Sequence, residues 1–319
     1  MKILVCPLNW GLGHAARCVP IIRQLITEGN DVVIAADGFP LEFLQLEFPE
    51  LRFLKAPTQN VRYSTGNSQI WAMFKSIPRI FGNIFQDHCW LHRLLKQEHF
   101  DRIISDNRFG CWNKRTYSIY ITHQLMVKMP PGLRLLEPIV WRLHRFFIHR
   151  YDECWIPDLA GDENFSGDLS HRYPLPENAH FIGIQSRFQQ LKNIIPNYTY
   201  ETVMVLSGPE PQRTIFEKQL TEKFSKDTVK SLMIQGLPQE KQTSVQVGNL
   251  TKVSHLSTQE MASLLAGAKK IIARSGYSTI MDLQALNCLD KALLIPTPGQ
   301  TEQIYLAELH KKCRCPENL

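Results

Sequence analysis

The chain has 319 residues, of which 44% are hydrophobic and 21% charged, a composition that excludes a disordered or fibrous protein and is typical of a globular one. This length exceeds what one core usually organises, so we expect two domains. The net charge of +6 comes from residues 1–150, which carry 19 Lys and Arg against 11 Asp and Glu and thus favour an anionic partner.

Short apolar runs alternate with helical patterns along the first half, and this alternation favours parallel strands joined by helices. A helix is predicted over residues 14–28, because apolar side chains recur at helical spacing until Gly29 and Asn30 end it. Residues 180–188 are interpreted as the crossing into a second domain. The predicted strands of this half are residues 2–8, 31–37, 51–57, 100–107, 117–124 and 152–158.

The second half repeats the alternation. Ser257 and Glu260 form a predicted capping box at the start of a helix over residues 257–268. The sequence therefore predicts an α/β protein of two Rossmann-like domains, residues 1–180 and 181–319, whose parallel sheets face each other across a cleft. The other predicted elements are helices 211–225, 277–287 and 300–312 and strands 201–208, 230–236, 250–254, 269–276 and 291–296.

A glycine loop follows the first predicted strand. Gly11, Gly13 and Ala16 fit the dinucleotide fingerprint G-x-G-x-x-G/A, and Asp37 lies where an acidic residue would hold a ribose. A single match of this kind is weak evidence, and a bulky His14 occupies the turn where a pyrophosphate would need small neighbours. A nicotinamide-dependent enzyme therefore stays an alternative, and the same loop equally fits a histidine placed beside an acceptor.

His14 is the candidate catalytic base of this loop. The start of a helix disfavours the imidazolium, so the ring stays neutral and can accept a proton. Asp106 ends a predicted strand near by, where its carboxylate can orient that imidazole. His123 ends the next strand and can take either part. The alternative is that His14 and Asp106 only cap helices.

The segment from residue 273 to residue 309 carries the most specific pattern. Arg274, Ser275 and Gly276 follow a predicted strand and lead into a helix, an arrangement suited to a diphosphate. Asp282, six residues after Gly276, can accept both hydroxyls of a ribose. Four further residues of the segment add hydroxyl, amide or carboxylate groups to this site: Ser278, Thr279, Glu302 and Gln303.

This segment resembles the nucleotide-sugar-binding half of glycosyltransferase family 28, which includes the enzyme that adds N-acetylglucosamine to the lipid-linked peptidoglycan precursor. The Gly11-Leu-Gly13-His14 loop shares the resemblance. It implies the GT-B fold, inversion at the anomeric carbon, and neither cofactor nor metal. It also implies that Arg274, Ser275 and Gly276 line the diphosphate, Asp282 holds the ribose, and Gln303 with Glu302 contacts the sugar. The remaining implied donor contacts are Arg187, Ser207, Gly208, His255 and Leu256.

The sequence also departs from that family. Asp282 stands where the nearest relatives carry Glu, and Ile304 replaces the second residue of a Gln pair. Prolines follow the Ser207-Gly208 turn. Such chains usually continue further past Gln303, so we expect the second domain to be shortened at its end. These departures leave the donor sugar and the acceptor open, with a UDP-linked sugar as the leading hypothesis.

Aromatic and basic residues alternate over residues 68–81, a pattern that fits peripheral contact with an anionic membrane as well as a core-facing stripe. Residues 141–150 show the same mixture and are interpreted as facing the core. A lipid-linked or cell-envelope glycan acceptor follows as a hypothesis. No nucleic-acid-binding motif accompanies the positive charge, so we expect no nucleic acid partner.

The eight scattered cysteines and the strand-like N-terminus predict a cytoplasmic protein, peripheral on the inner face of the membrane if it meets a lipid-linked acceptor. The leading function is thus a metal-independent hexosyltransferase. Two other functions remain open: a sugar-nucleotide epimerase on the same fold, and a non-catalytic protein that binds a nucleotide sugar.

Overall fold

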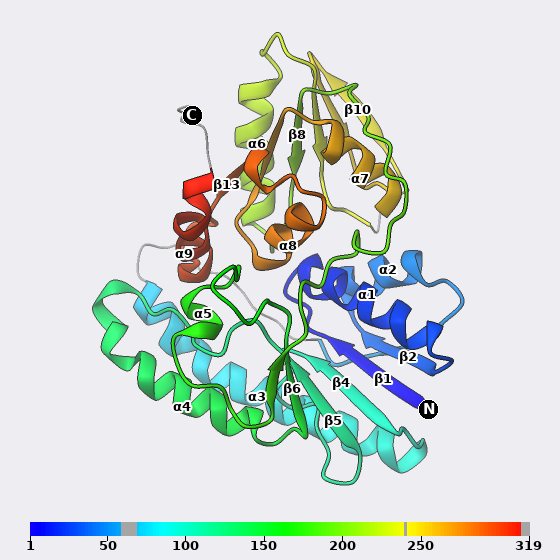
Figure 1. Cartoon of the computed structure of the whole chain (residues 1–319), viewed down its shortest axis with the longest axis vertical. Coiled ribbons are helices and arrows are strands. Elements are labelled where there is room, and N and C mark those ends of the chain that lie inside the picture. The colour runs from blue at the N-terminus through cyan, green and yellow to red at the C-terminus, as the bar shows by residue number, and fades with distance from the viewer. Residues whose placement is uncertain (59–68, 239–240, 314–319) are drawn as a thin grey trace. The chain divides into compact units, whose positions relative to one another are not determined.

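The computed structural model describes residues 1–58, 69–238 and 241–313, with side chains throughout except at residues 69–77, 131, 312 and 313. By its internal contacts the chain divides into two compact units (Figure 1). The first unit comprises residues 1–10 and 17–185. The second comprises residues 186–319 together with the short segment 11–16.

The first unit is built on one parallel sheet with the strand order β3-β2-β1-β4-β5-β6-β7 among its described residues. The six strands predicted for this half are present. Residues 179–181 form a seventh strand that pairs with β6, whereas the sequence interpretation began the crossing at residue 180. The strands are β1 (Lys2–Pro7), β2 (Asp31–Ala36), β3 (Arg52–Lys55), β4 (Arg102–Asp106), β5 (Tyr117–Ile121), β6 (Glu153–Ile156) and β7 (Ala179–Phe181).

Helices cover both faces of this sheet (Figure 1). Right-handed crossovers put the helices of β1-α1-β2-α2-β3 on one face, and the return of the chain to β4 puts α3 and α4 on the other. Leu91 of α3 is fully buried and belongs to one core cluster with Leu4, Val33 and Ile103 of the sheet. The helices are α1 (Leu12–Thr27), α2 (Gly38–Glu47), α3 (Gln69–Gln97), the 3-10 helix η1 (Pro131–Leu136), α4 (Glu137–Ile148) and α5 (Asp168–His171).

The second unit is a sheet with the strand order β10-β11-β9-β8-β12-β13, parallel except for the β10–β11 pair. Strand β10 was not predicted. Gly248 joins it to β11 at a φ of 60°, where a Cβ would lie 2.1 Å from the carbonyl oxygen of Ser225, so only glycine fits this turn. The strands are β8 (Thr202–Val205), β9 (Ser231–Ile234), β10 (Ser244–Val247), β11 (Leu250–Val253), β12 (Lys270–Arg274) and β13 (Ala292–Ile295).

The helices of this unit follow the sequence prediction closely. Ser257 and Glu260 form the expected capping box at the start of α7. Helix α6 packs Phe216 and Leu220 onto Met204 and Met233 of the sheet. In the described part of the chain, no helix combines the length and apolarity needed to cross a membrane. The helices are α6 (Gln212–Phe224), α7 (Thr258–Gly267), α8 (Tyr277–Ala285), the 3-10 helix η2 (Leu289–Lys291), α9 (Thr301–Leu309) and the 3-10 helix η3 (His310–Cys313).

Candidate functional site

The amino end of α8 is the centre of the candidate site. Strand β12 ends at Arg274, and Ser275 and Gly276 form the turn into the helix. The first three amides of an α-helix have no acceptor within it, and the aligned peptide dipoles make this end positive. The backbone N–H of Ile280 donates to the Gly276 carbonyl at 3.1 Å, so Tyr277 to Thr279 carry these three amides. This end of the helix therefore favours an anion.

Gln303 of α9 lies against this turn. Ser275 donates from Oγ to the Gln303 carbonyl at 2.8 Å, and the Thr297 N–H donates to Gln303 Oε1 at 2.8 Å. Because Oε1 accepts that bond, the other end of the amide is the donor group Nε2. Nε2 is 3.9 Å from where a Cβ on Gly276 would lie. Two helices separated by one strand thus bring Ser275, Gly276 and Gln303 together, and their contacts to a donor stay predictions.

Asp282 lies one and a half turns into α8 and is tied to the segment that opens the second unit. Ser186 donates from Oγ to Asp282 Oδ1 at 2.6 Å, and Arg187 Nε is 3.8 Å from Asp282 Oδ2. Burial raises the pKa of the Asp282 carboxyl, and the Arg187 charge and the Ser186 hydroxyl oppose that rise. Two residues predicted to contact different parts of a donor therefore contact each other. Ser186, fully buried, was not predicted.

Arg274 is placed differently from the expectation that it lines a diphosphate. Its side chain is 3% exposed, its guanidinium carbon is 3.8 Å from the centre of the Phe216 ring, and Nη1 donates to the Pro296 carbonyl at 3.0 Å. Burial lowers the pKa of Arg274 to about 10. The guanidinium therefore joins β12 to the loop after β13, and its contact with a diphosphate stays a prediction.

The other predicted donor residues lie at the same edge of the sheet. Ser207 and Gly208 follow β8, and His255 and Leu256 follow β11; both strands run parallel to β12, so their carboxyl ends share one edge. Gly208 has a φ of 101°, a conformation that favours glycine. His255 and Leu256 are half-buried, and Ser254 Oγ lies 3.1 Å from His255 Nδ1.

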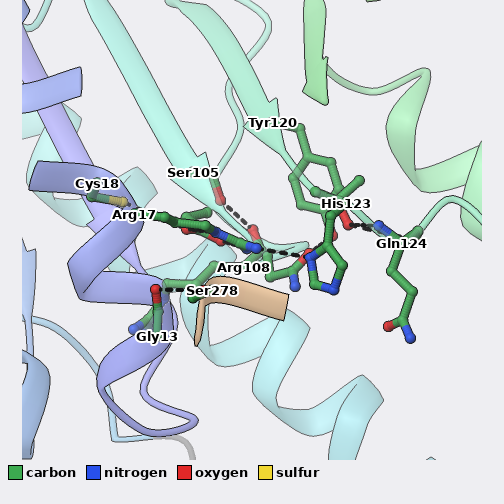
Figure 2. Close-up of polar contacts among 12 residues, drawn as sticks. Gly13, Arg17, Cys18, Ser105, Arg108, Tyr120, His123, Gln124 and Ser278 are labelled. Atoms are coloured by element: carbon green, nitrogen blue, oxygen red, sulfur yellow. Dashed lines mark hydrogen bonds and ion pairs between the residues drawn. The ribbon is translucent and has the colours of Figure 1, made fainter. Parts of the chain in front are cut away.

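The glycine loop of residues 11–16 contacts α8 within the second unit. Ser278 donates from Oγ to the Gly13 carbonyl at 2.9 Å, as Figure 2 shows. A Cβ on Gly13 would lie 3.0 Å from this hydroxyl, so the close approach depends on glycine. His14 comes directly after this contact, in the first turn of α1, and is half-buried. Residues 265 positions apart in sequence are thus neighbours.

A buried charge network occupies the edge of the first sheet. Arg17 of α1 is 2% exposed and pairs through Nε and Nη2 with both oxygens of Asp106, the Nε contact measuring 2.5 Å. Its Nη1 lies 2.8 Å from His123 Nδ1 (Figure 2). The thiol of Cys18 is 3.5 Å from Asp106, and burial raises its pKa well above the usual value. Arg17 was not predicted, because a single arginine in a helix carries no motif.

The arginine fixes the tautomer of His123. A guanidinium has only donors, so Nδ1 of His123 accepts from Arg17 and the ring proton of the neutral imidazole resides on Nε2. Asp37, the predicted ribose ligand of the dinucleotide alternative, is 3% exposed and accepts from Asn9 Nδ2 at 3.1 Å. Among the described residues, no group of three or more His, Cys, Asp and Glu side chains is arranged to hold a metal.

Comparisons with known proteins place this geometry in a wider context. No family model matches the chain. A protein of Methanosarcina mazei described as an uncharacterized glycosyltransferase is 20% identical over 318 residues, which cover 95% of this chain and 81% of that protein. It is a distant homologue of this chain.

Solved structures with the same fold include two of different activity. The glycosyltransferase SsfS6 of Streptomyces sp. SF2575 has a TM-score of 0.58 at 10% identity, covering 97% of this chain and 86% of that one. A putative UDP-N-acetylglucosamine 2-epimerase of Listeria monocytogenes has a TM-score of 0.53 at 11% identity, and the match covers 98% of this chain and 90% of that one. The predicted GT-B fold is confirmed, whereas the resemblance to family 28 stays a prediction.

Proposed function

We propose that this protein is a glycosyltransferase that moves a hexose from a nucleotide-sugar donor, UDP-linked in the leading hypothesis, to a hydroxyl acceptor. The observation that carries the proposal is the gathering of Ser275, Gly276 and Gln303 at the amino end of α8, with Asp282 on the same helix. One end of this site favours a diphosphate, and the other offers a carboxylate and an amide for hydroxyl groups.

The donor contacts follow from this arrangement. The diphosphate lies at the amides of Tyr277 to Thr279, with the hydroxyls of Ser278 and Thr279 beside it. Asp282 accepts the ribose hydroxyls, which compete with Ser186 for Oδ1. Gln303, together with Glu302, contacts the sugar. The nucleobase of the donor lies by the loops that follow β8 and β11. These loops carry Ser207, Gly208, His255 and Leu256.

Direct displacement with inversion needs one base and one stabilised leaving group. His14 removes the proton of the acceptor hydroxyl while the oxygen attacks C1 of the sugar, and the nucleoside diphosphate leaves with the bonding electrons. The Gly13–Ser278 contact supports this role, because it holds the residue before His14 against the helix that would bind the diphosphate. The α8 amides take the developing negative charge, and the proposed reaction uses no metal.

The acceptor is proposed to be a lipid-linked or cell-envelope glycan reached from the cytoplasmic face of a membrane. Apolar side chains on α3 and α4 support this: Phe81 is 48% exposed and Phe146 is 52% exposed. The interpretation of residues 141–150 as core-facing is wrong for Leu143 and Phe146 and right for His144 and Ile148. The predicted membrane stretch 68–81 lies largely outside the described side chains.

A second candidate, the sugar-nucleotide epimerase, is favoured by the fold likeness to the Listeria protein. The two reactions leave different products. Incubation with UDP-N-acetylglucosamine alone and mass spectrometry of the products distinguishes them: slow release of UDP is the side reaction of a transferase, and a free 2-epimer of the sugar with UDP marks an epimerase. Tight UDP binding with neither product would identify a non-catalytic binding protein.

A further inference from the structure

A cavity of about 550 Å³ lies in the first unit, at the carboxyl end of β3. Residues 55–58, which end β3 and follow it, form one wall. Residues of α3 from Phe85 to Arg93 form the other. In doubly wound sheets, ligands bind beyond the carboxyl ends of the strands, and this cavity occupies such a position. Its lining residues all belong to the first unit, whereas α8 belongs to the second.

Arg108 joins the two walls. It is fully buried, donates from Nε to Asp87 Oδ2 on α3 at 3.2 Å, and donates from Nη2 to the Pro57 carbonyl at 3.0 Å. Gly110 brings α3 still closer, because a Cβ there would lie 2.2 Å from the Ile84 carbonyl oxygen. The walls are therefore held at a fixed spacing, and a ligand does not have to order them.

The lining of the cavity is positively charged. Lys55 and Arg93 stand on opposite walls, both exposed, and none of the described lining residues is acidic. Neither cation forms an ion pair with a carboxylate of the described residues, in contrast to Arg17 and Arg108. Two cations on facing walls, without a carboxylate partner in the part of the chain that the structure describes, favour an anion between them.

The rest of the lining is apolar. Trp90 is half-buried and packs against the core cluster of the sheet, and Phe85 is 71% exposed at the same helix face. A ring or an aliphatic segment gains contact area on such side chains, and an indole face also suits the C–H face of a sugar. The cavity thus combines two cations with an aromatic wall. This lining suits a ligand that has an anionic group at one end and a ring or an apolar segment next to it.

We propose that this cavity binds the anionic end of the acceptor, a phosphate or carboxylate attached to a ring or apolar body. The acceptor role rests on the proposed function, whereas the anion site rests on the cavity alone. Strand β3 is three positions from β4 in the sheet, a separation of about 14 Å at the usual strand spacing. Along the first sheet, the cavity therefore lies about that far from the network of Arg17, Asp106 and His123.

Calorimetric titration with 2-naphthyl phosphate, 2-naphthoate and 2-naphthol tests the site in the full chain without nucleotide. We expect saturable binding of at least one anion and no saturable binding of the neutral naphthol. The preferred anion tells a phosphate-bearing acceptor from a carboxylate-bearing one. Equal affinity for 2-naphthol, or no saturable binding of either anion, would overturn the proposal.

Variants locate the binding. Lys55→Gln with Arg93→Gln removes both cations from exposed positions, and we expect affinity for the anion to fall at least about tenfold. The matched control is Lys114→Gln with Arg115→Gln, which makes the same charge change at exposed residues away from the cavity. An equal loss in the control, or no loss in the cavity variant, contradicts the assignment.

Cys89 offers a second readout because it is half-buried in the cavity lining, whereas Cys6, Cys18, Cys111, Cys154 and Cys288 are buried. Peptide mass mapping after brief N-ethylmaleimide treatment should show Cys89 modified, and saturating 2-naphthyl phosphate or 2-naphthoate should slow that modification in the wild type only. Unchanged Cys89 labelling with bound ligand would place the ligand elsewhere. UDP titration reports on the donor site separately: absence of UDP binding in the wild type sinks the proposed function and leaves the anion site standing, and UDP affinity should be unchanged in the Lys55→Gln, Arg93→Gln variant.

Discussion

Arg17 donates from Nη1 to Nδ1 of His123 across 2.8 Å, while its Nε and Nη2 neutralise Asp106. This relationship changes the assignment of roles at the edge of the first sheet. Asp106 has a permanent cation as its partner, and Nδ1 of His123 is occupied. We therefore assign His14 as the base that removes the proton from the hydroxyl of the sugar acceptor. Arg17 is a residue that positions His123.

Removing Arg17 should destabilise the fold strongly. Arg17→Met leaves the Asp106 carboxylate buried without its cation, and we expect the free energy of unfolding to fall by about 3–5 kcal/mol. Urea unfolding of the variant measures this loss. The double variant Arg17→Met with Asp106→Leu should recover a large part of it, since no uncompensated charge remains. A single-variant loss below about 1 kcal/mol would show that the pair is not buried as described.

His14→Ala should reduce transfer by at least about 100-fold, the usual contribution of a general base, and leave UDP affinity within about twofold. Steady-state transfer and calorimetric UDP titration measure the two quantities. His123→Gln is the comparison variant, because its Nδ1 does not serve as the base, and it should retain more activity than His14→Ala. A large loss of UDP affinity in His14→Ala, with little loss of turnover beyond it, contradicts the base assignment.

Gln303→Ala should impair sugar recognition more than nucleotide binding. The Thr297 N–H fixes the amide and leaves Nε2 near the Gly276 turn, and in the proposed donor arrangement this group contacts the sugar. We expect the affinity for the nucleotide sugar to approach that for UDP, with UDP affinity itself unchanged. Competition binding of the two ligands provides the measurement. Equal weakening of both would place Gln303 at the nucleotide instead.

His144 should make stability depend on pH. Burial beside the Phe109 and Tyr120 rings lowers its pKa from 6.5 to about 4. The folded protein therefore binds this proton less readily than the unfolded chain does. The neutral, buried ring therefore contributes to the free energy of unfolding in full above pH 6.5. This contribution, about 3 kcal/mol, is lost as the pH falls toward 4.

Urea unfolding at several pH values checks this contribution. His144→Leu should remove that part of the acid destabilisation, whereas His92→Leu, at an exposed histidine, should leave the profile unchanged. If His144→Leu loses as much stability at low pH as the wild type does, other groups cause the loss of stability in acid.

Local patterns in the sequence predicted much of the fold. The parallel strands of both sheets and the Ser257–Glu260 capping box are visible as short-range signals, because periodicity and capping act over a few residues. Strands β7 and β10 were missed. The first has three residues, and the second alternates exposed polar and apolar residues at the edge of a sheet, so neither shows a buried run.

The site was predictable where it follows a motif and not where it depends on partners far apart in sequence. Ser275, Gly276 and Gln303, which a motif singled out, lie together. The Ser186–Asp282 bond joins residues 96 positions apart, and the Arg17–Asp106 pair joins residues 89 apart. Arg274 fits the motif but is turned onto Phe216, a packing choice that its neighbours in sequence do not reveal.

The most direct test of the central claim, a nucleotide-sugar site at α8, is calorimetric titration of UDP and TDP into the wild type and Asp282→Ala. We predict saturable binding of at least one nucleotide to the wild type and an affinity at least about tenfold lower in Asp282→Ala, from the loss of bonds to the ribose. Asp290→Ala, the same change at an exposed acid of the second unit, should bind like the wild type. Absence of nucleotide binding, or equal affinity of Asp282→Ala and the wild type, would contradict this site.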